Sequence, residues 1–139
     1  MRNAFCTALG LLGSLIAGAF GGWDAALTTL VIFMAVDYVS GVIVAAVFHK
    51  STKTATGSLK SWIGFKGLCK KCMVLLMVLI AHRLDLAIGA AYIREAVIIG
   101  FTANEGLSII ENAGLMGIPL PKVITKAVDA LSDKSEVNK

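Results

Sequence analysis

A long apolar run with one carboxylate near its middle constrains this chain more than any other feature. The run, Ala25–Phe48, has no charged residue apart from Asp37 and is long enough to cross a bilayer. An ionisable group at that depth costs at least about 3 kcal/mol on insertion scales, so it persists only where it meets a partner or water. The sequence therefore predicts a membrane protein with a polar site inside the membrane.

The composition favours the same class. Hydrophobic residues make up 57% of the chain, charged residues 16%, and the mean hydropathy is +0.81, which is too apolar for a soluble domain of 139 residues. In a soluble protein, a net charge of +4 would suggest nucleic acid as a partner. Here the positive residues cluster between two apolar segments, so they indicate membrane topology, and we expect a lipid bilayer and no nucleic acid as partner.

Four apolar segments predict an all-α membrane protein with three to four transmembrane helices. They cover residues 4–20, 25–48, 72–92 and 96–118 of a membrane domain that spans residues 1–118. The third segment reaches the length of a span only by including charged residues, and the fourth is also compatible with a soluble amphipathic helix. Residues 119–139 are expected to form a cytoplasmic tail with a short amphipathic helix, disordered after Ser132.

The first segment carries rows of small residues. On a helix these rows merge into one smooth face, which in lipid allows close packing either within one subunit or between copies. The same stretch also imitates a secretory signal peptide, because Arg2 precedes a short apolar run that ends in small residues. The residues expected to support helix packing and a homo-oligomer are Gly10, Gly13, Ser14, Ala17, Gly18 and Gly22, and Gly41 in the second segment.

A basic segment separates the second and third apolar segments. Residues 49–71 contain no acidic residue, so the positive-inside rule places this loop in the cytoplasm, and four spans would then leave both termini there as well. Residues 59–68, which include Trp62 and Phe65, are expected to lie as an interfacial helix against anionic lipid. The lysines that indicate topology are Lys50, Lys53, Lys60, Lys66, Lys70 and Lys71.

Polar residues within the apolar segments form the candidate functional site. Asp37 lies twelve residues before His49 and Arg83 twelve residues after Lys71, so both are about 18 Å from the edges of the loop at 1.5 Å per residue. We therefore predict an ion pair between Asp37 and Arg83. The fourth segment repeats polar residues every four positions, which predicts a face that lines water. The polar residues expected inside the membrane are Asp37, Arg83, Asp85, Asn104, Glu105, Ser108, Glu111 and Asn112.

No catalytic, cofactor or metal site is expected. Cys69 and Cys72 have C-x-x-C spacing, but no second cysteine pair follows, which argues against a zinc or redox site. The chain has no glycine-rich phosphate loop and no nucleophile elbow. Because carboxylates inside a membrane also serve proton-coupled transporters, a small transporter is the main alternative function on these residues. An accessory membrane subunit is a third interpretation.

Several strings resemble the toxin-secretion/phage-lysis holin family of Gram-positive bacteria and their phages. The most specific one is Ala103-Asn-Glu-Gly-Leu-Ser-Ile-Ile-Glu-Asn112, which is followed by Gly117-Ile-Pro119-Leu-Pro121. The further strings are Asp37-Tyr-Val-Ser-Gly41-Val, Ser58-Leu-Lys-Ser61, Gly64-Phe-Lys-Gly67, Lys70-Lys71 and Leu84-Asp85. The resemblance covers the chain from about Asp37 to Leu131.

The resemblance implies a multi-pass protein of the bacterial (host) cytoplasmic membrane that self-associates and opens timed, non-selective lesions. Such lesions release a cytoplasmic endolysin, or a toxin, without any implied direct contact between the two proteins. The intramembrane polar residues are then expected to line the lesion. Family members are often described with three spans, whereas this chain has four apolar segments. No enzyme activity and no cofactor is implied.

Overall fold

The computed structural model describes residues 1–137, and every regular element in that range is an α-helix. The chain order is α1 (Arg2–Ala19), α2 (Ala25–Ala46), α3 (Ser61–Ile88), α4 (Ile93–Leu115) and α5 (Lys122–Val137). The expected all-α class and the helix at the C-terminal end are confirmed.

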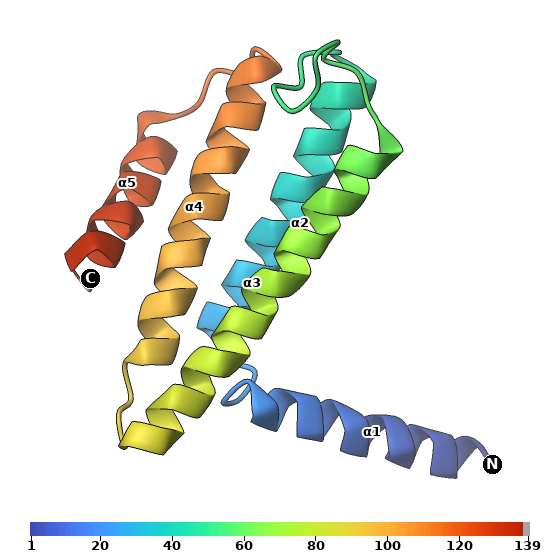
Figure 1. Ribbon diagram of the computed structural model, residues 1–139, viewed down its shortest axis with the longest axis vertical. Coiled ribbons are helices and arrows are strands. Elements are labelled where there is room, and N and C mark those ends of the chain that lie inside the picture. Colours follow the sequence, from blue (N-terminus) through green and yellow to red (C-terminus); the bar gives the residue numbers. More distant parts are fainter. Residues whose placement is uncertain (138–139) are drawn as a thin grey trace.

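Three of these helices, α2, α3 and α4, lie side by side and alternate in direction, and α5 folds back along α4 (Figure 1). A small apolar core joins the three long helices near the turn between α1 and α2. It contains Leu27, Leu30 and Met34 of α2, Val78 of α3 and Ile98 of α4. Because α4 contacts α2, α3 and α5, it is the central element of the bundle.

The first helix, α1, stands apart from this bundle. Figure 1 shows it pointing away from the end at which α2 begins, crosswise to the long axis, and none of its residues is buried. A Cβ atom added at Gly10, Gly13 or Gly18 would meet nothing within 4 Å. The small-residue face was expected to pack either within one subunit or between copies. In this structure no other part of the subunit packs on these glycines, so the face is uncovered.

The third helix is longer than expected. The predicted basic loop 49–71 is wrong in its second half, because α3 begins at Ser61 and joins the expected interfacial helix to the third apolar segment. Its 28 residues extend roughly 42 Å at 1.5 Å per residue. No strong helix breaker interrupts this stretch, and the helix ends at Gly89, whose φ of 68° is the left-handed conformation that suits a C-terminal cap.

The expected disorder after Ser132 is also wrong for the residues that the structure describes. The α5 helix continues to Val137, and Asn138 and Lys139 lie outside the described residues. Contact with α4 explains the ordered helix: Val128 is buried, and a Cβ atom at Gly106 would lie only 3.1 Å from its Cγ2 atom. Glycine in α4 therefore lets α5 approach closely.

Among the described residues, α2 alone combines the length and hydropathy of a membrane span. The other long helices are less apolar or carry more charge along their length. The expected count of three to four spans is thus not confirmed by length and composition.

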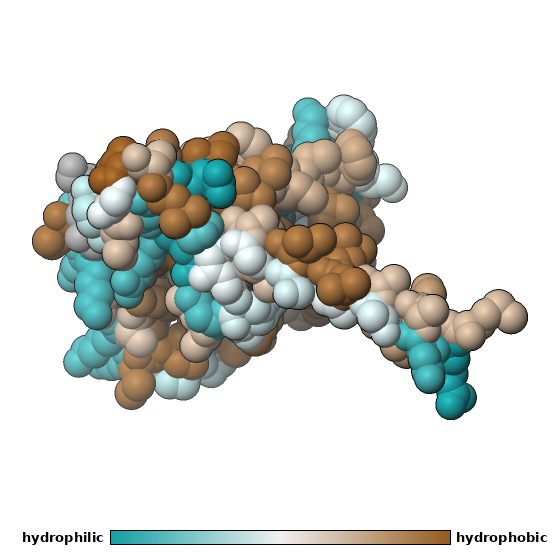
Figure 2. Space-filling view, turned by 90° about the horizontal axis from the view of Figure 1, so that it is seen from below, coloured by the Kyte–Doolittle hydropathy of each residue, from teal (hydrophilic) through white to brown (hydrophobic). Residues whose placement is uncertain are grey.

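The distribution of side chains is inverted relative to a soluble protein. Large apolar side chains are exposed on all five helices, including Leu15, Ile32, Ile80 and Leu107. Figure 2, viewed from the α1 end, shows such apolar residues at the surface of the bundle. Three carboxylates are buried, whereas others such as Glu95 and Asp129 are exposed: Asp37, Asp85 and Glu105 are 7%, 5% and 6% exposed. Because carboxylates are rarely buried without partners and extended exposed apolar surface marks contact with another apolar phase, the bundle is suited to lipid.

Candidate functional site: two polar networks in the helix bundle

The first polar network joins the three long helices through one lysine. The Nζ atom of Lys71, on α3, lies 2.8 Å from Oδ2 of Asp37 on α2 and also donates to Oε2 of Glu105 on α4. The side chains of all three residues are largely buried, with exposed fractions of 12%, 9% and 8%. One ammonium thus serves two carboxylates, and this cluster, Asp37–Lys71–Glu105, is the central ion cluster of the fold.

An amide extends the cluster toward the end of α4. Nδ2 of Asn112 donates to Oδ1 of Asp37 at 3.1 Å and lies 2.9 Å from Oγ of Ser40. Gly41 lies beside this contact, since a Cβ atom there would be 3.7 Å from the same Nδ2 atom. Both oxygens of Asp37 therefore have partners, as a carboxylate in a low-dielectric interior requires.

A cavity of about 370 Å³ adjoins the cluster, between α2, α3, α4 and the loop that precedes α3. Five of the polar residues predicted to lie inside the membrane line it together: Asp37, Asn104, Glu105, Ser108 and Asn112. Gly41 also lines this cavity. The polar residues that recur every four positions on α4 thus lie on one face of the helix, and this face borders the cavity.

The predicted ion pair between Asp37 and Arg83 is wrong. Arg83 is exposed on α3, and Lys71 lies beside Asp37 instead. The depth estimate failed because it placed the edge of the loop at Lys71, whereas α3 begins at Ser61. Lys71 is about 15 Å from the start of α3 and Asp37 about 14 Å from the end of α2, so these two are level.

Two other predicted residues lie away from the cavity. Asp85 is buried at the far end of α3, where its carboxylate accepts from the backbone N–H groups of Ile93 at 2.9 Å and Arg94 at 2.8 Å. It therefore caps the N-terminus of α4 from a neighbouring helix. Glu111 is exposed and borders a second, adjacent hollow with Thr52.

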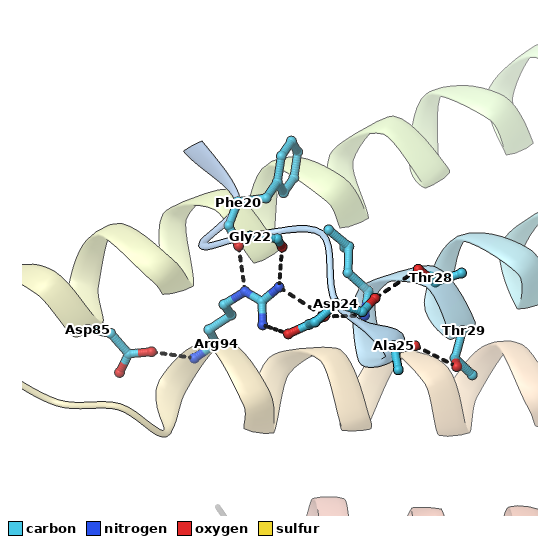
Figure 3. A network of polar contacts seen from close by, with 9 residues as sticks. Phe20, Gly22, Asp24, Ala25, Thr28, Thr29, Asp85 and Arg94 are labelled. Carbon is cyan, nitrogen blue, oxygen red and sulfur yellow. Dashed lines mark hydrogen bonds and ion pairs between the residues drawn. The ribbon is translucent and has the colours of Figure 1, made fainter. Parts of the chain in front are cut away.

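The second polar network surrounds Arg94, at the end of the bundle from which α1 projects (Figure 3). Its guanidinium donates to the backbone oxygens of Phe20 and Gly22, and pairs with Asp24 through Nη1 and Oδ2 at 2.7 Å. The Asp24 side chain also caps α2, accepting from the N–H of Leu27 at 2.9 Å. One arginine at the start of α4 thus fixes the turn between α1 and α2.

The roles of Lys71 and Arg94 were not predicted from the sequence, although the sequence contains a signal for Lys71. Gly64 and Gly67 let α3 approach Tyr38 of α2, because Cβ atoms at these positions would lie 3.5 and 3.8 Å from its hydroxyl and ring. Lys71 follows them at helical spacing on the same face. The assumption that residues 49–71 form a loop concealed this face. Arg94 has no comparable pattern, since its partners lie in a turn.

The comparison with known proteins now identifies the family. The chain matches the bacteriophage holin family over residues 14–133. It belongs to that family. Membership confirms the resemblance found in the sequence and places the protein in a membrane. It also agrees with the inverted distribution of apolar and charged side chains.

Relatives in several bacteria match nearly the whole chain. An uncharacterised protein of Clostridium perfringens is 35% identical over 136 residues, which is 95% of both chains. An uncharacterised protein of Listeria monocytogenes is 37% identical over 128 residues, covering 89% of this chain and 86% of its own. A probable holin of Bacillus phage phi105 is 27% identical over 111 residues, 79% of this chain and 76% of the phage protein. No solved structure matches this holin-family chain.

Removing Lys71 tests the central ion cluster. We expect Lys71→Gln to lower the free energy of unfolding by about 3–5 kcal/mol, because two carboxylates then remain buried without a cation. The triple variant Asp37→Asn/Lys71→Gln/Glu105→Gln removes every charge of the cluster and should recover most of that loss. Thermal unfolding in detergent, followed by circular dichroism, measures both. Arg83→Gln is the control and should stay within about 0.5 kcal/mol; a Lys71→Gln protein of equal stability would contradict the assignment.

Acid should weaken the second network through Asp24. Its hydrogen bond with Arg94 holds the pKa of the Asp24 carboxyl below the usual 3.8. The charge therefore stabilises the fold fully above about pH 4, and this contribution is lost as the pH falls through the lowered pKa. Asp24→Asn keeps a good helix cap but removes the charge, so the variant should be less stable at pH 7 by less than about 1 kcal/mol, since the Asp24 side chain is half-exposed. Unfolding curves that differ equally at pH 7 and well below pH 3.8 would refute this account.

Proposed function

We propose that this protein is a lysis holin: it accumulates in the bacterial cytoplasmic membrane, self-associates, and at a set time opens non-selective lesions. These lesions release an endolysin, or a toxin, from the cytoplasm. Family membership and the similarity to a probable phage holin support the class of function. The observation that carries the mechanism is the buried cluster Asp37–Lys71–Glu105 beside a polar cavity, inside a bundle with an apolar exterior.

The arrangement of the helices favours three spans rather than four. The α2, α3 and α4 helices lie side by side, whereas α1 projects crosswise from one end (Figure 1). We propose that the three parallel and antiparallel helices cross the membrane and that α1 lies at the outer surface. The basic loop 47–60 is then cytoplasmic, as the positive-inside rule requires, and so are the end of α4 and the start of α5. The charged residues Asp24, Asp85 and Arg94 are then near the outer headgroups, where their charge is least costly.

Self-association is attributed to the uncovered face of α1. A Cβ atom at Gly10 or Gly18 would meet nothing within 4 Å, and Ser14 on the same face is exposed. Such small residues allow helices to approach closely in lipid. Large apolar side chains exposed on the same helix, such as Leu11 and Leu15, would bury further surface in contact with other copies.

Lesion opening is attributed to a change in what the cluster contacts. In the closed subunit, Lys71 pairs with two carboxylates that would otherwise be very costly in lipid. When subunits assemble around water, Asp37, Glu105 and the polar face of α4 can be hydrated instead, which favours the open arrangement. The switch is then a population shift between a compact, lipid-tolerant subunit and a water-lined assembly.

Induced expression in a Gram-positive host that also makes a cytoplasmic endolysin tests the function. We expect collapse of the membrane potential and release of the endolysin after a delay, measured with a potential-sensitive dye and by endolysin activity outside the membrane. Expression of the endolysin alone is the control. An intact potential, with the protein shown to be inserted at normal levels, would defeat the holin proposal. Selective proton-coupled uptake would then favour the transporter, and dependence on another protein the accessory subunit.

Bulky residues on α1 test the self-association surface. Cys6 lies on the small-residue face and is exposed, so oxidative cross-linking of Cys6 in a Cys69→Ser/Cys72→Ser background reports close approach of two α1 helices. We expect Gly18→Leu to reduce the cross-linked fraction severalfold, while Ala8→Leu, on the opposite side of the helix, leaves it unchanged. Insertion should persist in both, because leucine favours lipid. Equal cross-linking in the two variants would show that this face contacts only lipid.

A further inference from the structure

We propose that the cavity beneath the loop 47–60 binds the phosphodiester headgroup of an anionic phospholipid of the phosphatidylglycerol type. The proposal rests on the function proposed above in one respect, because it requires the protein to be inserted with this loop at the cytoplasmic surface. The cavity of about 370 Å³ is within the usual size of small-molecule sites.

The charges around the cavity favour an anion. Its lining includes four lysines and two carboxylates, and the carboxylates, Asp37 and Glu105, are already paired with Lys71. The other three, Lys53, Lys60 and Lys70, have no ion-pair partner among residues 1–137. Positive charge therefore remains uncompensated around the cavity, which is the charge complement of a phosphodiester.

The loop forms a defined wall for this cavity. The N–H of Ser51 donates to the backbone oxygen of Gly57 at 3.0 Å, and Oγ1 of Thr54 donates to that of Ser58 at 3.0 Å. Gly57 has a φ of 72°, and a Cβ atom there would lie 2.0 Å from the backbone oxygen of His49. The loop thus has a closed, hydrogen-bonded shape that requires glycine, and its residues Ser51, Thr54 and Ser58 all line the cavity.

The wall formed by α4 suits the glycerol of the headgroup. Asn104, Ser108 and Asn112 line the cavity with neutral amide and hydroxyl groups, which can exchange hydrogen bonds with a polyol. A cavity that combines lysines with neutral polar groups therefore matches a phosphodiester followed by a glycerol better than it matches a second carboxylate or an apolar ligand.

Aromatic residues place the cavity at the depth of lipid headgroups. Trp62 and Phe65 follow Lys60 at the start of α3, are 63% and 55% exposed, and stack with ring centroids 5.7 Å apart. Nζ of Lys66 lies 5.5 Å from the centre of the Trp62 ring. Exposed tryptophan with flanking lysine is typical of the boundary between headgroups and acyl chains. The ligand is therefore assigned to the membrane rather than to the cytosol.

Quenching of Trp62 fluorescence can measure this binding. The chain has two tryptophans, so Trp23→Phe, at the opposite end of the bundle, leaves Trp62 as the reporter. The full-length protein in phosphatidylcholine nanodiscs is titrated with phosphatidylglycerol brominated on its acyl chains. We expect saturable quenching at a few mole per cent of the anionic lipid, beyond the quenching by brominated phosphatidylcholine.

Two double variants with the same change in net charge provide the comparison. Lys53→Gln/Lys70→Gln removes one lysine of the loop and one lysine of α3, and both of these line the cavity. Lys50→Gln/Lys66→Gln also removes one lysine of the loop and one of α3, but neither of these lines the cavity. The first should weaken binding about 30-fold, since each lysine near the headgroup contributes about fivefold. The control should weaken it only about threefold, through screened surface charge. Equal weakening in both variants would overturn the site.

Two further measurements separate this proposal from others. Competition by millimolar glycerol phosphate in detergent, with no preference for the lipid, would assign the cavity to a soluble phosphate ester and overturn the lipid assignment. The holin proposal is tested by leakage in cells, so saturable lipid binding without leakage would reject that proposal and retain this one. Leakage without saturable binding would reject the lipid site and retain the holin proposal.

Discussion

The ammonium of Lys71 is the contact on which the bundle depends. It lies between a carboxylate of α2 and a carboxylate of α4, while its own helix is α3, so a single side chain joins all three long helices. In an apolar environment neither carboxylate tolerates burial alone, and the lysine has no better partner at its depth. A small apolar core, which includes Met34 one turn before Asp37, joins the same helices toward the turn between α1 and α2. Charge pairing therefore holds the three helices together in the middle of the bundle, next to this core.

The two polar networks lie in different parts of the molecule and have different roles. The Arg94 network fixes the direction in which α1 leaves the bundle, because it holds the turn between α1 and α2 against the start of α4. The Lys71 cluster joins the polar face of α4 to α2 and α3 within the subunit. An uncovered α1 and a closed polar face are compatible with the proposed holin subunit, which contacts other copies before any water-lined path exists. In that proposal, assembly and opening have separate structural origins.

The buried ion cluster also bears on the proposed function. Replacing a buried ion cluster by apolar residues is often neutral or favourable, so a buried cluster in a membrane bundle is consistent with the proposed state in which those groups meet water. The cavity next to Asp37 and Glu105 brings that hydrated surface close to the cytoplasmic loop. In the proposed mechanism, a lesion that opens from this side needs only separation of the three helices that Lys71 joins.

The sequence by itself determined the class of protein, the helices and most of the polar face. Hydropathy and the spacing of Asn104, Ser108 and Asn112 depend on local periodicity, which a helix converts directly into one face. The tertiary structure alone decided which charges pair. Lys71 was interpreted as a lysine that only sets membrane topology, because its helix was expected to begin after it. Arg94 contacts backbone oxygens in a turn, and such contacts leave no pattern in the sequence. The depth of a residue along a helix can be counted from the sequence only when the ends of the helix are known. Which side chains meet across two helices depends on how each helix is rotated and how closely the two approach. For α2 and α3, the glycines at positions 64 and 67 set this through packing on Tyr38.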